Sequence, residues 1–175
     1  GGLLVRLPVA PIAADRGFPS IMPQPRVYSN RYRVTAPMTR AAQPIRFAPS
    51  HPLARRLAKE VDGEVLFDKA SRGRYSTDAS IYQVEPIGVV VPRTLDAAIA
   101  ALTIAAQEGV AILPRGAGTS QCGQTVGTAL VVDSSKYLNR VLEVDVAARR
   151  AVVEPGVVLD QLNARLKKDG LWFPV

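Results

Sequence analysis

The sequence is poor in the residues that most metal and redox sites require. Its 175 residues include one cysteine, Cys122, and one histidine, His51. A single cysteine excludes an internal disulfide, an iron–sulfur cluster and a cysteine-based zinc site built within this chain. His51 directly precedes Pro52 and belongs to the entry of a helix, so no histidine remains as a general base in the domain that follows. We therefore expect no metal site here.

Long apolar runs are also absent. No run approaches the roughly 18 apolar residues of a membrane span, and residues 2–14 are too interrupted for a signal peptide. These absences predict a chain without a transmembrane segment and a cytoplasmic location, with peripheral membrane association left open.

Acidic residues are nearly absent from residues 1–50, which carry seven arginines and only Asp15. Residues 51–175 carry fifteen basic and fourteen acidic residues, so the net charge of +7 belongs mainly to the N-terminal segment. A nearly neutral domain gives no indication of nucleic-acid binding. The N-terminal segment is rich in proline and arginine without apolar periodicity, which predicts a disordered tail over residues 1–50, with residues 1–45 outside the core. A targeting segment and a cloning artefact remain alternatives.

What is present suits one globular core, since 47% of the residues are hydrophobic. Apolar periodicity predicts helices over residues 52–61, 94–106 and 158–166. Apolar runs predict strands over residues 63–67, 89–91, 110–113, 129–133, 141–144 and 151–154, and a last strand is expected after the helix that ends at Gly170. The second helix is expected to bury Leu95, Ile99, Leu102 and Ala106, and the polar residues 68–84 are expected to be irregular. This order predicts a mixed α+β layer rather than a regular βαβ repeat.

The most informative feature is a glycine-rich loop, PRGAGTSQCGQ at residues 114–124, which follows the apolar run 110–113. Its glycines let the backbone turn sharply and point successive N–H groups into one concavity. The hydroxyls of Thr119 and Ser120 add donors, and Arg115 adds a positive charge. This chemistry suits a phosphate or pyrophosphate and hence a nucleotide cofactor, although glycine loops between strands are also often plain turns.

Two common nucleotide-binding loops do not fit. No lysine lies between residues 70 and 135, which excludes a Walker A loop. A Rossmann fingerprint requires a glycine three residues after Gly118, where Gln121 stands, and a helix that starts at the loop. Here the loop runs into the apolar run 129–133 with no room for a helix. Backbone N–H groups between two strands, rather than a helix terminus, must therefore hold the anion.

The loop resembles the pyrophosphate loop of FAD-binding domains of the vanillyl-alcohol oxidase / p-cresol methylhydroxylase (PCMH) type. The flanking segments that agree are GVVVP at 88–92, LVVD at 130–133 and AVVEPGV at 151–157. RYSTDAS at 74–80 and GLWFP at 170–174 further resemble FAD-linked oxidases that act on D-2-hydroxy acids, the bacterial D-lactate and D-2-hydroxyglutarate dehydrogenases. The resemblance covers the chain from about residue 52 to its end, in order.

The resemblance implies an α+β fold, namely the N-terminal part of a PCMH-type FAD-binding domain, with a mixed β-sheet and flanking helices. That domain would occupy residues 85–175 and be truncated at its C-terminus, with a lead-in helix and irregular segment over residues 51–84. The whole protein would oxidise a small-molecule D-2-hydroxy acid by hydride transfer to FAD and pass electrons to an unidentified acceptor, while this fragment alone would be inactive. Another FAD-linked oxidase of the superfamily and a standalone, non-catalytic nucleotide-binding module are the alternatives.

The resemblance also assigns residues to FAD. The pyrophosphate loop comprises Arg115, Gly116, Ala117, Gly118, Thr119 and Ser120, and Gly123 and Gln124 lie near the ribityl chain and the isoalloxazine ring. Pro92 passes near the diphosphate or the adenine, and Glu154, Pro155 and Gly156 form a turn on the adenine side. A structural salt bridge is an equal alternative for Arg115, as is an ordinary surface carboxylate for Glu154.

Several oxidases of the superfamily carry a covalent flavin link on a histidine at the position of Thr119, so the resemblance implies noncovalent FAD. It places the catalytic base and the carboxylate-binding groups outside this chain, and we expect no catalytic residue here. Tyr75 and Asp78 either reach the flavin or pack the loop. Cys122 is either a reactive thiol beside the pyrophosphate or a small packing residue.

Overall fold

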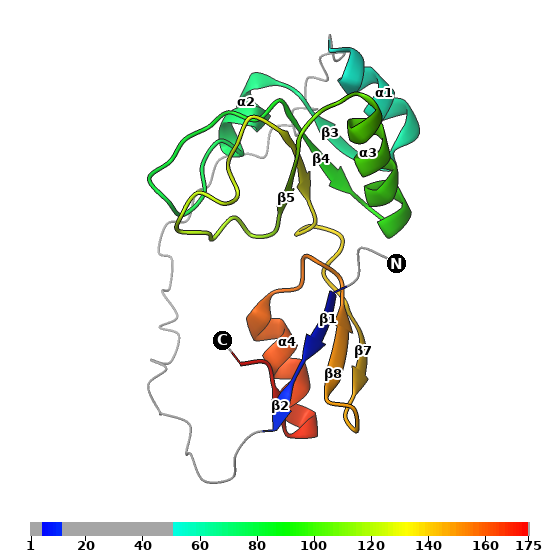
Figure 1. Cartoon of the computed structure of the whole chain (residues 1–175), viewed down its shortest axis with the longest axis vertical. Helices are drawn as coiled ribbons and strands as arrows, with labels where there is room; N and C mark the ends of the chain where they lie inside the picture. The colour runs from blue at the N-terminus through cyan, green and yellow to red at the C-terminus, as the bar shows by residue number, and fades with distance from the viewer. Residues whose placement is uncertain (1–4, 12–50, 175) are drawn as a thin grey trace, which may run out of the picture. The chain divides into compact units, whose positions relative to one another are not determined.

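The computed structural model describes residues 5–11 and 51–174 (Figure 1). The helices are α1 (Pro52–Glu60), α2 (Lys69–Arg74), α3 (Leu95–Gln107) and α4 (Leu159–Leu166), followed by the 3-10 turn η1 (Lys167–Asp169). The strands are β1 (Val5–Pro8), β2 (Ala10–Pro11), β3 (Gly63–Leu66), β4 (Gly88–Pro92), β5 (Ile112–Arg115), β6 (Leu130–Asp133), β7 (Val141–Asp145), β8 (Arg150–Val153) and β9 (Leu171–Trp172). Mixed sheets with flanking helices confirm the expected α+β class. None of the helices in these two ranges has the length and apolarity needed to cross a membrane.

The largest sheet is mixed and has the strand order β3-β4-β6-β5. Strands β4, β5 and β6 are parallel, and β3 is antiparallel to β4. Both central strands are buried along their whole length, as expected for parallel strands covered on two faces. Val90 and Leu130 pack on one face with α1 and α3, which lie beside each other in Figure 1, while Val89 and Val131 pack on the other face.

Helix α3 confirms a predicted helix but not its predicted buried face. The Thr94 hydroxyl caps its start by accepting from the Ala97 N–H at 3.1 Å, and Gly109 follows its end with φ +64°. Ile99, expected inside, is 47% exposed. The buried residues are Ala97, Ala98, Ala101, Ile104 and Ala105. Because alanines let a helix approach the sheet closely, they form the contact face in place of the larger residues.

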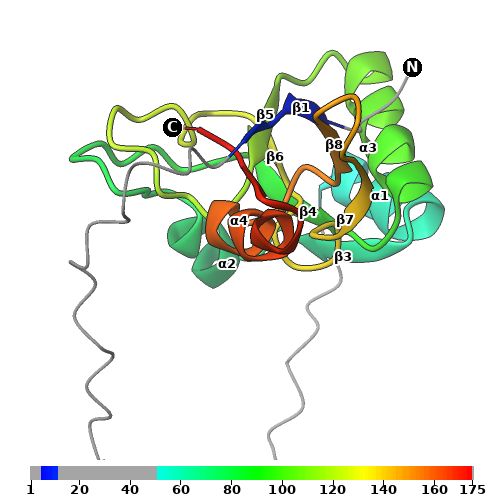
Figure 2. The ribbon, with the colours of Figure 1, turned by 90° about the horizontal axis from the view of Figure 1, so that it is seen from below.

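A second sheet has the order β1-β8-β7 and is wholly antiparallel (Figures 1 and 2). Strand β2 pairs with β9. Helix α4 packs on this sheet through Leu162 and Leu166, which are buried with Val153 and with Val9 between β1 and β2. The expectation that residues before 45 lie outside the core is therefore wrong for residues 5–11. Strands this short and interrupted by prolines show no apolar periodicity in the sequence. They form through pairing with β8 and β9. The rest of the predicted tail lies outside the described residues.

One further element differs from expectation. Within the segment expected to be irregular, α2 forms because the Asp68 carboxylate caps it, accepting from the Ser71 N–H at 2.9 Å. The strand expected after Gly170 is confirmed as β9, which pairs with β2. The first predicted helix, with Leu53 and Leu57 buried, and the hairpin β7–β8 are confirmed.

We expect Val9→Ser to lower the free energy of unfolding by about 1.5–3 kcal/mol, because it removes a buried apolar side chain and places a hydroxyl in its position. Val146→Ser is the matched control, since Val146 is 48% exposed in the turn after β7. Urea unfolding followed by circular dichroism measures both. Equal stability of the two variants would mean that the N-terminal strands add nothing to the core.

Candidate cofactor-binding site

Three parallel strands bring their carboxyl ends to one edge of the larger sheet. Pro92 ends β4, Arg115 ends β5 and Asp133 ends β6, and the last two are direct register partners. Open sheets with parallel strands bind ligands beyond this edge. Pro92 is fully buried, so the structure exposes no part of this predicted site residue.

The glycine loop begins at this edge. Residues 116–129 join β5 to β6 without any helix, which confirms the predicted position between two strands. Gly118 and Gly123 have φ values of +69° and +77°, a left-handed conformation that favours glycine. Within the described part of the chain, the backbone N–H groups of residues 116–121 donate to no protein acceptor. The loop therefore has a row of free donors available to an anion.

The Arg115 side chain folds beneath this loop. Its guanidinium donates to the carbonyl oxygens of Thr125 at 3.0 Å, Thr77 at 2.9 Å and Tyr75 at 3.5 Å, and lies 5.2 Å from the Tyr75 ring centroid. These acceptors are neutral, and among the described residues Arg115 forms no ion pair. The expected alternative of a structural salt bridge is thus wrong. A Cβ on Gly118 would lie 2.8 Å from the Arg115 Cζ, so the guanidinium passes directly under the glycine.

Asp78 holds the far end of the loop. Its carboxylate accepts from the Thr125 hydroxyl at 3.0 Å, from the Thr125 N–H at 3.4 Å and from the Ser80 N–H at 2.8 Å. Hydrogen bonding from Ser80, with a smaller contribution from Thr125, lowers the pKa of the Asp78 carboxyl to about 2. Asp78 therefore packs the loop, one of the two roles expected for it.

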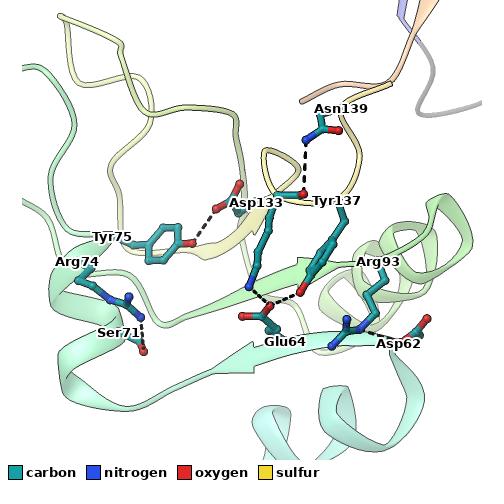
Figure 3. A network of polar contacts seen from close by, with 10 residues as sticks. Asp62, Glu64, Ser71, Arg74, Tyr75, Arg93, Asp133, Tyr137 and Asn139 are labelled. Atoms are coloured by element: carbon teal, nitrogen blue, oxygen red, sulfur yellow. Dashed lines mark hydrogen bonds and ion pairs between the residues drawn. The ribbon is translucent and has the colours of Figure 1, made fainter. Parts of the chain in front are cut away.

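A pair formed by the half-buried Tyr75 and the buried Asp133 links the same segment to the end of β6 (Figure 3). The Tyr75 hydroxyl donates to Asp133 at 2.7 Å, and the other oxygen of Asp133 accepts from the Ser135 N–H at 2.8 Å. Burial raises the pKa of the Tyr75 phenol well above its usual value, and the hydrogen bond to Asp133 adds to this shift. Tyr75 is therefore a neutral packing residue. Sequence reasoning missed Asp133, although an acidic residue directly after the apolar run LVV was a usable signal.

A second polar network fixes the turn after β6 (Figure 3). Glu64 on β3 accepts from the Tyr137 hydroxyl at 2.6 Å and pairs with the Lys136 ammonium. The Arg93 guanidinium lies 5.0 Å from the Tyr137 ring centroid and pairs with Asp62 at 3.5 Å. These contacts hold residues 134–138 against β3 and β4.

The turn Glu154–Pro155–Gly156 packs on those residues. The Gly156 N–H donates to the Leu138 carbonyl at 2.8 Å, and a Cβ on Gly156 would lie 2.7 Å from the Ser134 carbonyl carbon. The Ser134 N–H in turn donates to the Arg115 carbonyl at 3.0 Å. Ser134 thus connects this turn to the start of the glycine loop, so the structure gathers the predicted site residues around one edge.

Glu154 is not the surface carboxylate that was one alternative, because it is only 1% exposed. Both of its oxygens accept from Arg140: the backbone N–H at 2.8 Å, and the guanidinium at 2.8 Å and 3.2 Å. This guanidinium lowers the pKa of Glu154 below its usual value, against the opposing effect of burial. The carboxylate is turned away from solvent and occupied by Arg140.

The remaining loop side chains are accessible. Thr119 and Cys122 are exposed, and the Ser120 hydroxyl donates to the Gln124 amide oxygen. Of the two roles expected for Cys122, that of a small packing residue is therefore wrong, because the side chain is exposed on the glycine loop. Within the described ranges, no group of three or more His, Cys, Asp and Glu residues has a metal-binding arrangement.

An apolar hollow of about 240 Å³ adjoins the turn at 154–156. Its lining residues are Leu7, Val153, Glu154, Pro155, Val157, Leu159, Leu162 and Phe173. Strands β1 and β8 and helix α4 thus provide a partly open, apolar space beside the second group of predicted site residues.

Comparison with known proteins gives a family match over half of the chain. A family model described as "FAD binding domain" matches residues 86–175. The D-2-hydroxyglutarate dehydrogenase of Pantoea ananatis (strain AJ13355) is 42% identical over 119 residues, which cover 66% of this chain and 12% of that protein. The glycolate oxidase subunit GlcD of Bacillus subtilis (strain 168) is 40% identical over 120 residues, covering 66% and 25%.

Solved structures agree on the fold. The wild-type BBE-like 1 protein of Physcomitrella patens has a TM-score of 0.56 at 27% identity, covering 67% of this chain and 26% of that one. A p-cresol methylhydroxylase with bound substrate has a TM-score of 0.52 at 16% identity, covering 67% and 24%. These findings confirm the resemblance to PCMH-type FAD-binding domains. The chain spans 12% to 25% of the length of the two curated relatives named above.

Proposed function

The chain belongs to the FAD binding domain family, and from that premise we propose that its glycine loop holds the pyrophosphate of a noncovalently bound FAD. The observation that carries this proposal is the row of free backbone N–H groups at residues 116–121. Such a row binds an anion without a helix terminus. Arg115 adds a positive charge that no carboxylate neutralises within the described residues, and the exposed Thr119 hydroxyl adds a side-chain donor.

The glycines support the same proposal. Gly118 and Gly123 have left-handed φ values, and a Cβ on Gly123 would lie 2.7 Å from the Tyr82 ring. A side chain at either position would therefore displace Arg115 or Tyr82 and change the shape of the loop. We place the ribityl chain and ring beyond Gly123 and Gln124. The turn at 154–156 and the apolar hollow beside it suit the adenine.

For the whole protein we propose oxidation of a small D-2-hydroxy acid. When bound, FAD supplies the acceptor for the hydride from the α-carbon of the substrate. Relatives named D-2-hydroxyglutarate dehydrogenase and glycolate oxidase subunit support a 2-hydroxy acid as the substrate class. The residues described here bind and orient the cofactor. Tyr75, Asp78 and Asp133 are all engaged in packing contacts, so we place the catalytic base and the substrate carboxylate site outside the described residues.

We expect acid precipitation of the whole protein to release the flavin. Thr119 occupies the position at which several oxidases of the superfamily carry the histidine that binds flavin covalently. The yellow chromophore should remain in the supernatant, where chromatography identifies it as FAD. FMN, which lacks the pyrophosphate, should bind far more weakly than FAD to the stripped protein. Flavin that stays in the pellet would reveal a covalent link elsewhere.

The activity has its own test. Anaerobic addition of D-2-hydroxyglutarate or D-lactate should bleach the visible flavin absorbance, and the L-enantiomers should not. A protein that binds FAD but is reduced by neither D-acid belongs to another branch of the FAD-linked oxidases, which leaves the proposed cofactor site intact.

A further inference from the structure

The glycine loop is closed at its base by a side chain. Arg115 precedes the loop, and its guanidinium donates to the Thr125 carbonyl at 3.0 Å. Residues 116–124 therefore form an arch whose two ends are joined by this hydrogen bond. The free N–H groups at residues 116–121 lie on this arch, and its far end is held at Thr125.

Thr125 is also held from the opposite side. The Asp78 carboxylate accepts from its hydroxyl at 3.0 Å and from its N–H at 3.4 Å. All polar groups of Thr125 thus bind side chains from two different segments, Arg115 through the carbonyl and Asp78 through the hydroxyl and N–H. The same carboxylate is oriented by the Ser80 N–H at 2.8 Å.

The segment that carries Asp78 is itself anchored to the sheet. The Tyr75 hydroxyl binds Asp133 at the end of β6. Ser76 is buried, and its hydroxyl donates to the Gly73 carbonyl at 2.8 Å. Thr77 pairs with Gln83 in an isolated antiparallel bridge. Asp78 therefore projects from a supported segment and can transmit its position to Thr125.

We propose that Asp78 is a positioning residue for the FAD loop, which it holds open through Thr125. This inference rests on the function proposed above. A loop already shaped for its ligand binds more tightly, because less conformational entropy is lost on binding. Without Asp78, the arch would have to order as FAD binds, and the free N–H groups at residues 116–121 would no longer converge on the pyrophosphate beforehand.

Because Asp78 is negatively charged, the direction of the change in FAD affinity distinguishes positioning of the loop from electrostatic repulsion. A carboxylate near the pyrophosphate repels it, so the Coulomb interaction alone predicts that removal of Asp78 tightens FAD binding. Positioning through Thr125 predicts the opposite. We expect Asp78→Ala to weaken FAD binding by about tenfold to a hundredfold, the range for hydrogen bonds to a charged group. Thr125→Val should also weaken FAD binding. Thr125→Ser keeps the hydroxyl and should bind FAD with wild-type affinity.

The experiment uses the whole protein stripped of flavin and follows FAD binding and dissociation by flavin fluorescence. Asp78→Asn is included as a shape-preserving variant should Asp78→Ala not fold. The matched control is Glu60→Ala, since Glu60 is an exposed carboxylate at the end of α1 paired with Arg56 at 3.2 Å, outside the contacts that hold Thr125 and the turn after β6. Its FAD affinity should equal that of the wild type. The melting temperature of each apoprotein separates loss of binding from loss of folding.

FAD affinity of Asp78→Ala within twofold of the wild type, or tighter than it, overturns the proposal. The proposal is also overturned if Thr125→Ser binds FAD as weakly as Thr125→Val does. If the wild type itself binds no FAD, the proposed function fails, and limited tryptic cleavage of the apoprotein after Arg115 then decides on Asp78. Faster cleavage in Asp78→Ala than in Glu60→Ala supports positioning of the loop, and equal cleavage overturns it.

Discussion

Replacing Gly118 with valine is expected to weaken FAD binding by the whole protein about a hundredfold or more. The glycine has φ +69°, which a β-branched residue adopts only with strain. Its Cβ would lie 2.8 Å from the Arg115 Cζ and 3.0 Å from the Nε. The guanidinium would have to leave the carbonyls of Thr77 and Thr125, and the new side chain would bias the loop away from the shape that exposes its N–H groups.

The matched control for this variant is Gly109→Val. Gly109 has φ +64° at the end of α3, and a Cβ there would meet nothing within 4 Å. The control therefore carries the same backbone strain without the clash against Arg115. We expect it to lower the melting temperature while FAD affinity, measured by isothermal titration, stays at the wild-type value. Equal FAD affinity in the two variants would show that Gly118 matters only for folding, and would remove the loop from the proposed pyrophosphate site.

The position of the glycine loop was predictable from sequence because its neighbours leave few alternatives. The apolar runs 110–113 and 129–133 enclose a polar, glycine-rich stretch too short for a strand–helix–strand unit. The left-handed Gly118 and Gly123 then follow from local chemistry. These glycine conformations depend on residues adjacent in the chain, so the sequence alone can indicate them.

The partners of the loop were not predictable in the same way. Arg115 binds the carbonyls of Tyr75 and Thr77, about forty residues earlier in the chain, and backbone carbonyls carry no sequence signal. The burial of Glu154 likewise depends on Arg140, which lies across the β7–β8 hairpin. Strand β1 escaped prediction because four residues with a proline show no period, and only the pairing with β8 reveals it. Each miss concerns a contact made by the tertiary fold.

Glu154→Gln is expected to lower the free energy of unfolding by about 1–2 kcal/mol at neutral pH. The variant keeps the shape of the side chain but loses the charge that accepts four hydrogen bonds from three N–H groups of Arg140. The Arg140 side chain is 71% exposed, so solvent screens part of the ion pair and keeps the effect modest for a buried carboxylate. Since the carboxylate faces Arg140, we expect FAD affinity to fall much less than in Gly118→Val.

The pH dependence of this difference identifies its cause. The Arg140 guanidinium lowers the pKa of Glu154 in the folded protein. A carboxyl with a lowered folded pKa binds fewer protons when folded, so its stabilisation is fully present above the ordinary glutamate pKa and disappears as pH falls through the folded pKa. The gap in unfolding free energy between the wild type and Glu154→Gln should therefore be largest near neutrality and shrink in acid. Glu143→Gln, an exposed position on β7, should change stability by less than about 0.5 kcal/mol at every pH. A gap for Glu154→Gln that stays constant from neutral to acid pH would assign the loss to packing of the amide rather than to the charge held by Arg140.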